Sequence, residues 1–196
     1  ISEDYRIDTW YRVFIRNLDQ LENAASFGLL RELVENIYTN EYLGRLLPAW
    51  NAALDYEKVP EGIPQQRHFF DARVRNIKER TVVIISDAMR YEVGEALVKM
   101  LEEDPNSTVS IGAELSVLPS YTALGMAALL PHRTMEMTDE YKILIDGKPT
   151  DDIPAREVIL QSYQPQGVCI QFDTLKHMKT VTELRSVLTG QQVVYV

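Results

Sequence analysis

The sequence predicts an α/β fold: a mostly parallel β-sheet with flanking helices, preceded by a helical N-terminal segment. The first observation is that residues 1–58 show helical periodicity and no strand pattern. The second is that residues 65–196 alternate strand-like apolar runs with helical stretches, which predicts parallel strands joined by crossover helices. The third is the run at residues 82–85, in which every side chain is apolar and β-branched, as in a central strand covered on both faces.

Apolar residues recur every three or four positions in the N-terminal segment, so each predicted helix has one face available for burial. Three helices are expected there, at residues 10–21, 29–37 and 43–50. Pro48 should break or kink the third helix, because proline lacks a backbone N–H and clashes with the preceding turn. Two prolines and a glycine at residues 59–64 indicate a linker. The expected organisation is a helical segment at 1–58, this linker, and an α/β domain at 65–196.

Within the α/β domain, apolar β-branched runs indicate strands and a 3.6-residue period indicates helices. Strands are expected at residues 82–85, 109–118, 141–145, 168–172 and 193–196. Helices are expected around residues 69–77, 90–103, 122–130, 155–161 and 181–188. Asp146-Gly147 follows the third strand and favours a tight turn. Parallel strands end at a common edge of the sheet, where proteins of this fold class bind ligands.

The composition limits the classes of function. A formal net charge of −9 does not support nucleic acid as a partner, because such binding depends on Lys and Arg. No run of about 18 apolar residues indicates a membrane span, and the first residues lack the pattern of a signal peptide, so a soluble, cytoplasmic protein is expected. The single cysteine, Cys169, lies in an apolar run and is interpreted as a buried strand residue rather than a reactive thiol.

Asp87 lies two residues after Ile85, the end of the strand expected at residues 82–85, and is the first candidate site residue. A carboxylate at the end of a buried strand can hold a divalent metal, because hard cations prefer carboxylate oxygens. The alternative is that Asp87 caps the helix that follows. The residue alone does not decide between these interpretations.

Thr122 is the second candidate. It ends the sequence Pro119-Ser120-Tyr121-Thr122, in which proline terminates the preceding strand and a helix of small residues begins. A hydroxyl at the start of a helix lies at its positive end, where an alkoxide or a phosphate is stabilised. Thr122 could instead be a helix cap, and Ser120 is a rival hydroxyl. Only the pairing of Thr122 with Asp87, 35 residues earlier, favours a catalytic role.

This pairing resembles the alkaline phosphatase superfamily, whose members place a metal-binding aspartate before a serine or threonine nucleophile. Val-Ile-Ile-Ser-Asp-Ala-Met-Arg-Tyr-Glu at residues 83–92 and Pro-Ser-Tyr-Thr-Ala-Leu-Gly-Met-Ala-Ala-Leu-Leu-Pro at residues 119–131 look like the PglZ family of phage-resistance (BREX) systems. The resemblance spans residues 65–196. It implies an alkaline-phosphatase-like fold, here incomplete, and a metal-dependent phosphatase or phosphodiesterase.

Carried over to this sequence, the resemblance makes Asp87 a ligand of a divalent metal, expected to be zinc in a two-metal site. It makes Thr122 the nucleophile and a contact of the metal. Ser120 and Arg90 become candidates for binding the phosphoester substrate. Arg90 could neutralise a phosphate oxygen by a bidentate contact, and a pair with a nearby carboxylate on the helix surface is an equal alternative.

In the superfamily, the further aspartates and histidines of the two-metal site lie mostly downstream of these strands. The chain is therefore expected to be a fragment that is inactive alone. Its own histidines, His68, His132 and His177, are weak candidates for the other ligands. Two functions stay open: part of a metal-dependent phosphoesterase of a phage-defence system, or a non-catalytic assembly or binding component that retains the fold. Other subunits of such a system are the expected partners.

Overall fold

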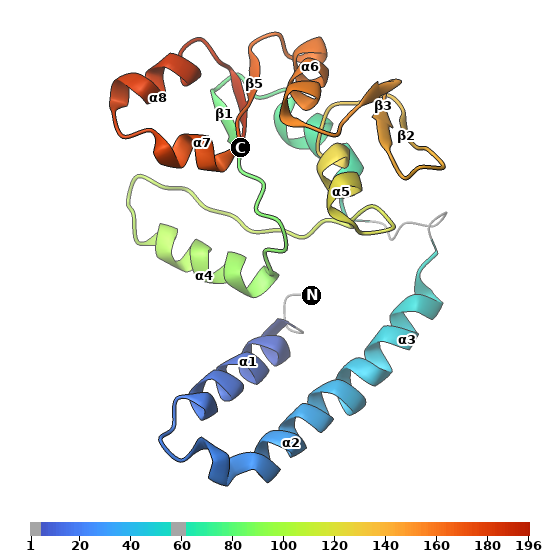
Figure 1. The fold of residues 1–196 in the computed structure, drawn as a ribbon, viewed down its shortest axis with the longest axis vertical. Helices are drawn as coiled ribbons and strands as arrows, with labels where there is room; N and C mark the ends of the chain where they lie inside the picture. The colour runs from blue at the N-terminus through green and yellow to red at the C-terminus, as the bar shows by residue number, and fades with distance from the viewer. Residues whose placement is uncertain (1–4, 56–61) are drawn as a thin grey trace. The chain divides into compact units, whose positions relative to one another are not determined.

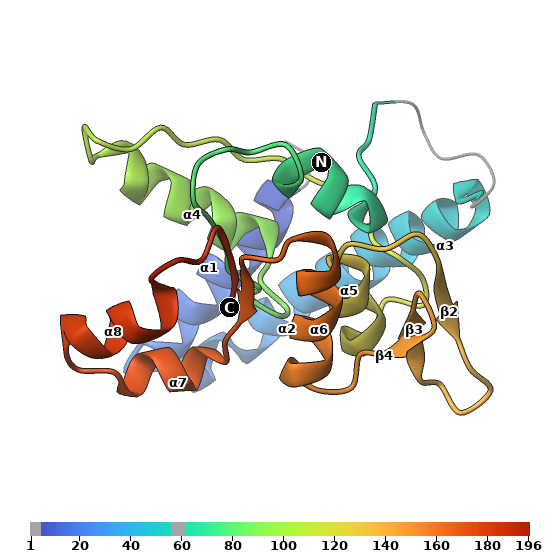
Figure 2. The ribbon, with the colours of Figure 1, turned by 90° about the horizontal axis from the view of Figure 1, so that it is seen from above.

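The computed structural model describes residues 5–55 and 62–196, and the chain divides into two compact units (Figure 1 and Figure 2). The first unit comprises Ile1–Gly62 and Met89–Ala113, and the second comprises Ile63–Ala88 and Glu114–Val196. Each unit is therefore built from two separate stretches of the chain. Within the described residues, no helix is both long enough and apolar enough to cross a membrane.

The first unit consists of helices. They are α1 (Tyr5–Asp19), a short 3₁₀ helix (Ala24–Phe27), α2 (Gly28–Asn36), a π-helical segment (Ile37–Leu43), α3 (Gly44–Ala53) and α4 (Tyr91–Glu102). Figure 1 shows α2 and α3 as one continuous rod. Pro48 lies inside α3 and does not end the helix, contrary to the expected break. Proline removes only its own backbone N–H, and the neighbouring residues keep their helical hydrogen bonds. Residues 59–61 of the expected linker lie outside the described residues.

Polar side chains join α1 to α4 in the first unit. Thr9 Oγ1 donates a hydrogen bond to Glu92 Oε2 at 2.9 Å, and Arg12 forms an ion pair with the same carboxylate. Leu18 is the only buried residue among those that the structure describes in this unit. The other apolar side chains of this unit that the structure describes are partly or largely exposed; the exposed fraction of Leu29, for example, is 85%.

The second unit contains the predicted parallel sheet. Its strands are β1 (Thr81–Val83), β5 (Gly167–Cys169) and β6 (Val193–Tyr195), in the order β1-β6-β5. The central strand β6 pairs in parallel with both neighbours, with Val194 opposite Val82 and Val168. Val194 is buried, as expected for a parallel strand covered on both faces. The parallel α/β arrangement is thereby confirmed.

Helices cover both faces of this sheet. On one side lie α5 (Thr122–Ala128) and α6 (Ile153–Tyr163), and on the other lie α7 (Phe172–His177) and α8 (Val181–Leu188) (Figure 1 and Figure 2). The main core contains these buried side chains: Phe70, Val74, Val83, Leu124, Ala127, Leu130, Ile143, Ile145, Ile159, Leu160, Val193 and Tyr195. Phe70 and Val74 come from a π-helical turn (Phe70–Val74), which follows a 3₁₀ turn (Gln66–His68) in place of the regular helix expected at 69–77.

A second, antiparallel sheet corrects the prediction for residues 141–145. This run is β3 (Ile143–Ile145), and it pairs with β2 (Met135–Met137) and β4 (Lys148–Pro149) rather than joining the parallel sheet. The predicted Asp146-Gly147 turn explains the difference, because Asp146 and Gly147 have φ values of 50° and 75°. Two successive positive φ values form the tight hairpin turn that returns the chain antiparallel to itself.

The strand expected at residues 109–118 does not form. Leu115 makes a single bridge with Gln65, through Leu115 N–H to Pro64 O at 2.7 Å and Gln66 N–H to Leu115 O at 2.9 Å. The alternation of apolar and polar residues was the signal for a strand, but no neighbouring strand continues the pairing. The same segment also crosses between the two compact units at Ala113.

The prediction for residues 168–172 was also too long at its C-terminal end. Strand β5 ends at Cys169, and α7 begins at Phe172, where no helix was expected. Ile170 N–H still donates to Tyr195 O at 2.8 Å. The apolar character of Phe172 extended the strand signal beyond the paired residues, because periodicity does not separate a short apolar strand from the start of a helix.

Candidate functional site

Asp87 lies beyond the carboxyl end of β1, the edge of a parallel sheet at which ligands bind. The pairing of β1 with β6 continues as far as Ile85, whose N–H donates to Val196 O at 2.8 Å. This bond holds the backbone in place two residues before Asp87. Asp87 is exposed in a turn, followed by Ala88 with a φ of 56°. The residue that caps α4 is Arg90, and its side chain makes no capping bond. Asp87 is therefore not the cap of α4.

Thr122 is the first residue of α5. The capping position belongs to Tyr121, which makes no side-chain capping bond. Tyr121 Oη instead donates to Tyr141 O at 3.1 Å and ties the start of the helix to the antiparallel sheet. On the opposite side of α5, Leu124 and Ala127 are buried in the core. Thr122 is thus held on the exposed face of a short, well-anchored helix.

The structure brings the two main candidates together. Thr122 Oγ1 donates a hydrogen bond to Asp87 Oδ2 at 3.1 Å, across 35 residues of sequence and within the second unit. Both side chains are exposed, so a substrate in solution has access to them. A threonine hydroxyl beside a carboxylate is an arrangement that can lose its proton during nucleophilic attack.

The Asp87–Thr122 pair also fits one side of a divalent metal site. Two oxygen ligands of one ion, each with a bond of about 2.0–2.1 Å, lie about 3.0–3.3 Å apart, and the observed separation is 3.1 Å. Within the part of the chain that the structure describes, no group of three or more His, Cys, Asp or Glu side chains could hold a metal. Among the described residues, the Asp87–Thr122 pair is therefore not part of a complete set of metal ligands.

Ser120 and Arg90 occupy different surroundings. Ser120 is exposed in the loop two residues before α5, and its hydroxyl has no hydrogen-bond partner among the described residues. Thr122, by contrast, is already bonded to Asp87. Arg90 directly precedes α4 and belongs to the first unit, whereas Asp87, Ser120 and Thr122 belong to the second.

A cavity of about 280 Å³ opens at the same edge of the parallel sheet, and the sequence did not reveal it. Ile85 from the β1 end and Met126 from α5 contribute to its wall, together with Arg156 from α6. Arg156 follows no strand, so its position in the sequence did not predict a role at the strand ends. An arginine next to a glutamate in a helix is its only sequence signal, and that signal is weak because such pairs are common on helix surfaces.

Cys169 also borders this cavity. Burial, and secondarily the negative charge of Glu157, raise the pKa of the Cys169 thiol to about 12. The backbone N–H of Cys169 donates to Glu157 Oε2 at 2.9 Å. The thiol is therefore protonated near neutral pH and is a poor nucleophile, which agrees with its interpretation as a strand residue.

The second unit thus has a parallel α/β architecture, with an aspartate beyond the end of β1 paired to a hydroxyl at the start of α5, and this arrangement is compatible with an alkaline phosphatase-like domain. The family model of the BREX system PglZ alkaline phosphatase-like domain matches residues 67–196. The chain belongs to this family.

Two curated relatives match the whole chain. The alkaline phosphatase-like protein PglZ of Bacillus cereus (strain H3081.97) is 36% identical over 202 residues. The alkaline phosphatase-like protein BrxZ of Escherichia coli O9:H4 (strain HS) is 36% identical over 211 residues. The chain spans about a quarter of the length of each, with 24% of either relative covered. No solved structure gives a significant match.

Proposed function

We propose that the chain is part of a metal-dependent phosphatase or phosphodiesterase of a bacterial phage-defence system, with Thr122 as its nucleophile. The hydrogen bond from Thr122 Oγ1 to Asp87 Oδ2 at 3.1 Å is the observation that carries the proposal. Membership of the BREX PglZ family supports the class of reaction and the biological setting. The roles of Arg90 and Ser120 in binding the phosphoester stay predictions.

In this proposal, Thr122 Oγ1 attacks the phosphorus atom and forms a covalent phosphothreonine, while the bond from phosphorus to the leaving oxygen breaks. The hydroxyl proton already lies on the hydrogen bond to Asp87, so this carboxylate is placed to accept it. Water then hydrolyses the phosphothreonine and restores the hydroxyl. The proton passes to the departing oxygen, and no other co-reactant is needed.

A divalent metal, which we propose to be zinc, would be held by Asp87 and Thr122. When bound, it would lower the pKa of the threonine hydroxyl and offset the negative charge that develops on the phosphoryl oxygens. We expect the remaining ligands of a two-metal site to come from parts of the longer relatives outside the quarter that this chain matches. We therefore expect the chain to be inactive alone.

The test is metal-dependent hydrolysis of bis-p-nitrophenyl phosphate and p-nitrophenyl phosphate by a full-length protein that contains this chain. Thr122→Ala and Asp87→Asn should each lower kcat by about a thousandfold, because each removes a reacting or orienting group. Thr122→Ser should retain part of the activity. Thr182→Ala is the matched control, since Thr182 is an exposed threonine on α8 in the same unit and outside the candidate site, and it should change kcat less than about threefold.

Those variants also separate the proposal from the second function. If hydrolysis is undiminished in Thr122→Ala and Asp87→Asn, the pair is not catalytic. If instead the unmodified full-length protein hydrolyses neither ester, a non-catalytic assembly or binding component is favoured, with the other subunits of the defence system as its partners. In that case both variants should assemble with those subunits as the unmodified protein does, as measured by co-purification of the defined subunits.

A further inference from the structure

We propose that Arg156 forms an anion-binding subsite beside the Asp87–Thr122 pair, and that the adjoining cavity takes a small apolar substituent of a phosphoester. This inference deepens the proposed function and rests on it for the identity of the anion. It concerns residues to which the sequence motifs assign no role.

The cavity borders both segments that carry the candidate site. Ile85 in its wall lies two residues before Asp87, and Met126 lies four residues after Thr122 in α5. Residues four apart in a helix lie on the same face, about 6 Å apart along the axis. A phosphoester whose phosphorus atom meets Thr122 can therefore place one substituent in this cavity.

Arg156 is a half-buried cation without a carboxylate partner among the described residues. Its Nε donates to Thr150 O at 2.9 Å, and its Nη1 donates to Met126 Sδ at 3.2 Å. A guanidinium has five N–H donors, so three stay free. The neighbouring carboxylate of Glu157 accepts the backbone N–H of Cys169 instead.

The other arginines of the second unit are all exposed. Arg75 forms an ion pair with Asp71, and Arg73 pairs with Glu114. The rest have no carboxylate partner among the described residues but remain open to water: Arg67, Arg80, Arg133 and Arg185. A guanidinium that is partly removed from water and lacks such a partner is unfavourable unless an anion completes its interactions. Arginine is also the side chain best suited to bind phosphate oxygens in pairs.

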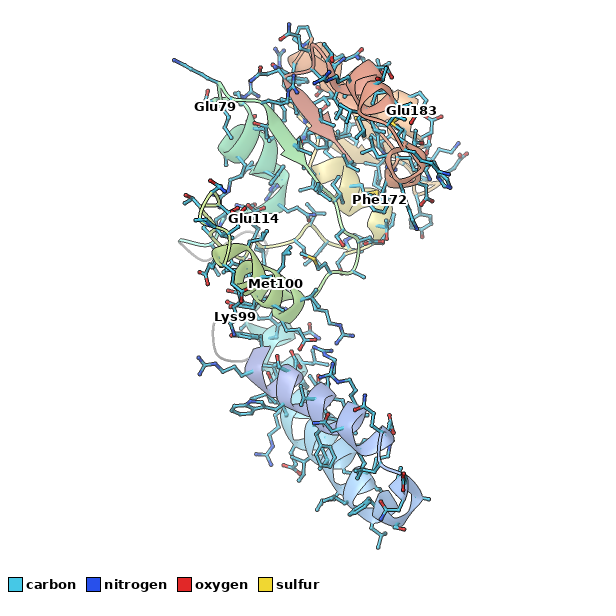
Figure 3. All side chains as sticks on the ribbon, turned by 90° about the vertical axis from the view of Figure 1, so that its left-hand side faces the viewer. Glu79, Lys99, Met100, Glu114, Phe172 and Glu183 are labelled. Atoms are coloured by element: carbon cyan, nitrogen blue, oxygen red, sulfur yellow. The ribbon has the colours of Figure 1, made fainter. Side chains whose placement is uncertain are left out.

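The remaining wall explains why the ligand should be a phosphoester rather than free phosphate. It is mainly apolar, with Leu130, Ile170 and Tyr195 among its side chains. Phe172, labelled in Figure 3, contributes at the start of α7 and is 62% exposed. A volume of 280 Å³ lies just below the usual range of ligand pockets, about 300–1,000 Å³. It suits a compact group such as a phenyl ring.

The experiment uses this chain labelled with ¹³C at the methyl groups of its six methionines. The Met126 methyl reports on the cavity because its sulfur contacts Arg156, whereas Met135 and Met137 in β2 serve as internal references. Titration with phenyl phosphate should give a saturable shift of the Met126 signal only. Inorganic phosphate should bind about tenfold more weakly, because it buries no apolar surface.

Variants then test the role of the guanidinium. Arg156→Gln should weaken phenyl phosphate binding at least about tenfold, while Arg156→Lys should retain part of it because the charge remains. Arg185→Gln is the matched control, since Arg185 is an exposed arginine on α8 in the same unit, and binding should not change. Unaltered reference signals from Met135 and Met137 show that each variant is folded.

Two results would overturn the inference: no shift of Met126 with millimolar phenyl phosphate, or equal affinity in Arg156→Gln. Neither bears on the nucleophile, because this readout needs no turnover. If Arg156-dependent binding of phenyl phosphate is observed but no full-length protein hydrolyses the esters, only the proposed function is contradicted. If hydrolysis is observed but binding does not depend on Arg156, only the proposed subsite is contradicted.

Discussion

Ala88, directly after Asp87, adopts the left-handed backbone region with a φ of 56°. Alanine has no side-chain oxygen to support this conformation, and its Cβ approaches the following carbonyl at a cost of about 1–2 kcal/mol. The turn that positions Asp87 is thus held against a local preference. Such strain is often found at functional sites, where the surrounding structure fixes it.

Ala88→Gly should therefore raise the free energy of unfolding of the second unit by about 0.5–1 kcal/mol, since glycine removes the clash but loses more backbone entropy on folding. Ala123→Gly is the control, because Ala123 is an exposed helical alanine in α5 at which glycine should cost about 1 kcal/mol or less. Urea unfolding followed by circular dichroism measures both. A larger loss in Ala88→Gly than in Ala123→Gly would contradict the strain argument.

At the same scale, the sequence predicted part of the candidate site. Asp87 and Thr122 could be identified because each lies where the chain leaves a strand or enters a helix, so local rules place them. The contact between them needed the motif resemblance as well. Arg156 could not be found in this way, because its position beside Met126 depends on how α5 and α6 pack around the sheet.

The antiparallel sheet is the element that local sequence determined most directly, through one aspartate. Asp146 enters the turn between β3 and β4, and its Oδ1 accepts the backbone N–H groups of Arg133 at 3.0 Å and Thr134 at 2.9 Å. Tyr163 Oη donates to the other carboxylate oxygen. The carboxylate thus ties the turn, the segment before β2, and α6 together.

These bonds have a consequence for pH. Burial would raise the pKa of Asp146, but the hydrogen bonds from Tyr163, Thr134 and Arg133 outweigh it and lower the pKa to about 2. The value in an unfolded chain is about 3.9. The charged carboxylate therefore stabilises the fold fully above about pH 4, and this stabilisation is lost as the pH falls through about 2.

Asp146→Asn tests this dependence, because asparagine also tolerates a positive φ and keeps the turn. The variant should be less stable than the unmodified chain at pH 6, and the difference should shrink as the pH falls from 4 to 2. Urea midpoints across this range give the measurement. Asp139→Asn, at an exposed residue after β2, is the comparison and should show no such trend. A constant difference for Asp146→Asn would refute the account.

The outcomes for the strands show what an element needs beyond its own sequence. The β-branched runs at β1 and β6 both form strands, but only β6 is central and fully buried. The expectation that residues 82–85 are covered on both faces was wrong, because β1 lies at the edge of the sheet and Val82 is 53% exposed. Residues 109–118 were also predicted as a strand, but pairing requires a neighbour that lies far away in sequence. Local pattern reveals the capacity to form a strand, whereas the fold decides whether a partner is present.

For the whole molecule, charge and burial are divided unequally between the two units. The segments Ile1–Gly62 and Met89–Ala113 contain sixteen Asp and Glu against eight Lys and Arg, so −8 of the formal charge of −9 falls on the first unit. Among the described residues, that unit buries only Leu18, while the second contains the whole of the main core. The two units should therefore differ in stability.

Hydrogen–deuterium exchange should show this difference. Peptides from α2 and α3 should exchange at least about tenfold faster than peptides from β5 and β6, because little apolar burial opposes local opening of the helices. The intact chain is exchanged at neutral pH, the reaction is stopped, and the peptides obtained by proteolysis are compared by mass spectrometry. The exposed helix α8 provides a reference within the second unit. Similar protection in both units would show that the first unit has stabilising contacts beyond those described.

The position of β6 between β1 and β5 determines when the parallel sheet can form during synthesis. Thr81 pairs with Val193 and Gly167 also pairs with Val193, so no two of these strands can join before residue 193 has been made. At about 5–20 residues per second, the ribosome needs several seconds to pass from β1 to β6. Throughout that interval β1 is an apolar segment without its partner, open to chaperones and to association with other nascent chains.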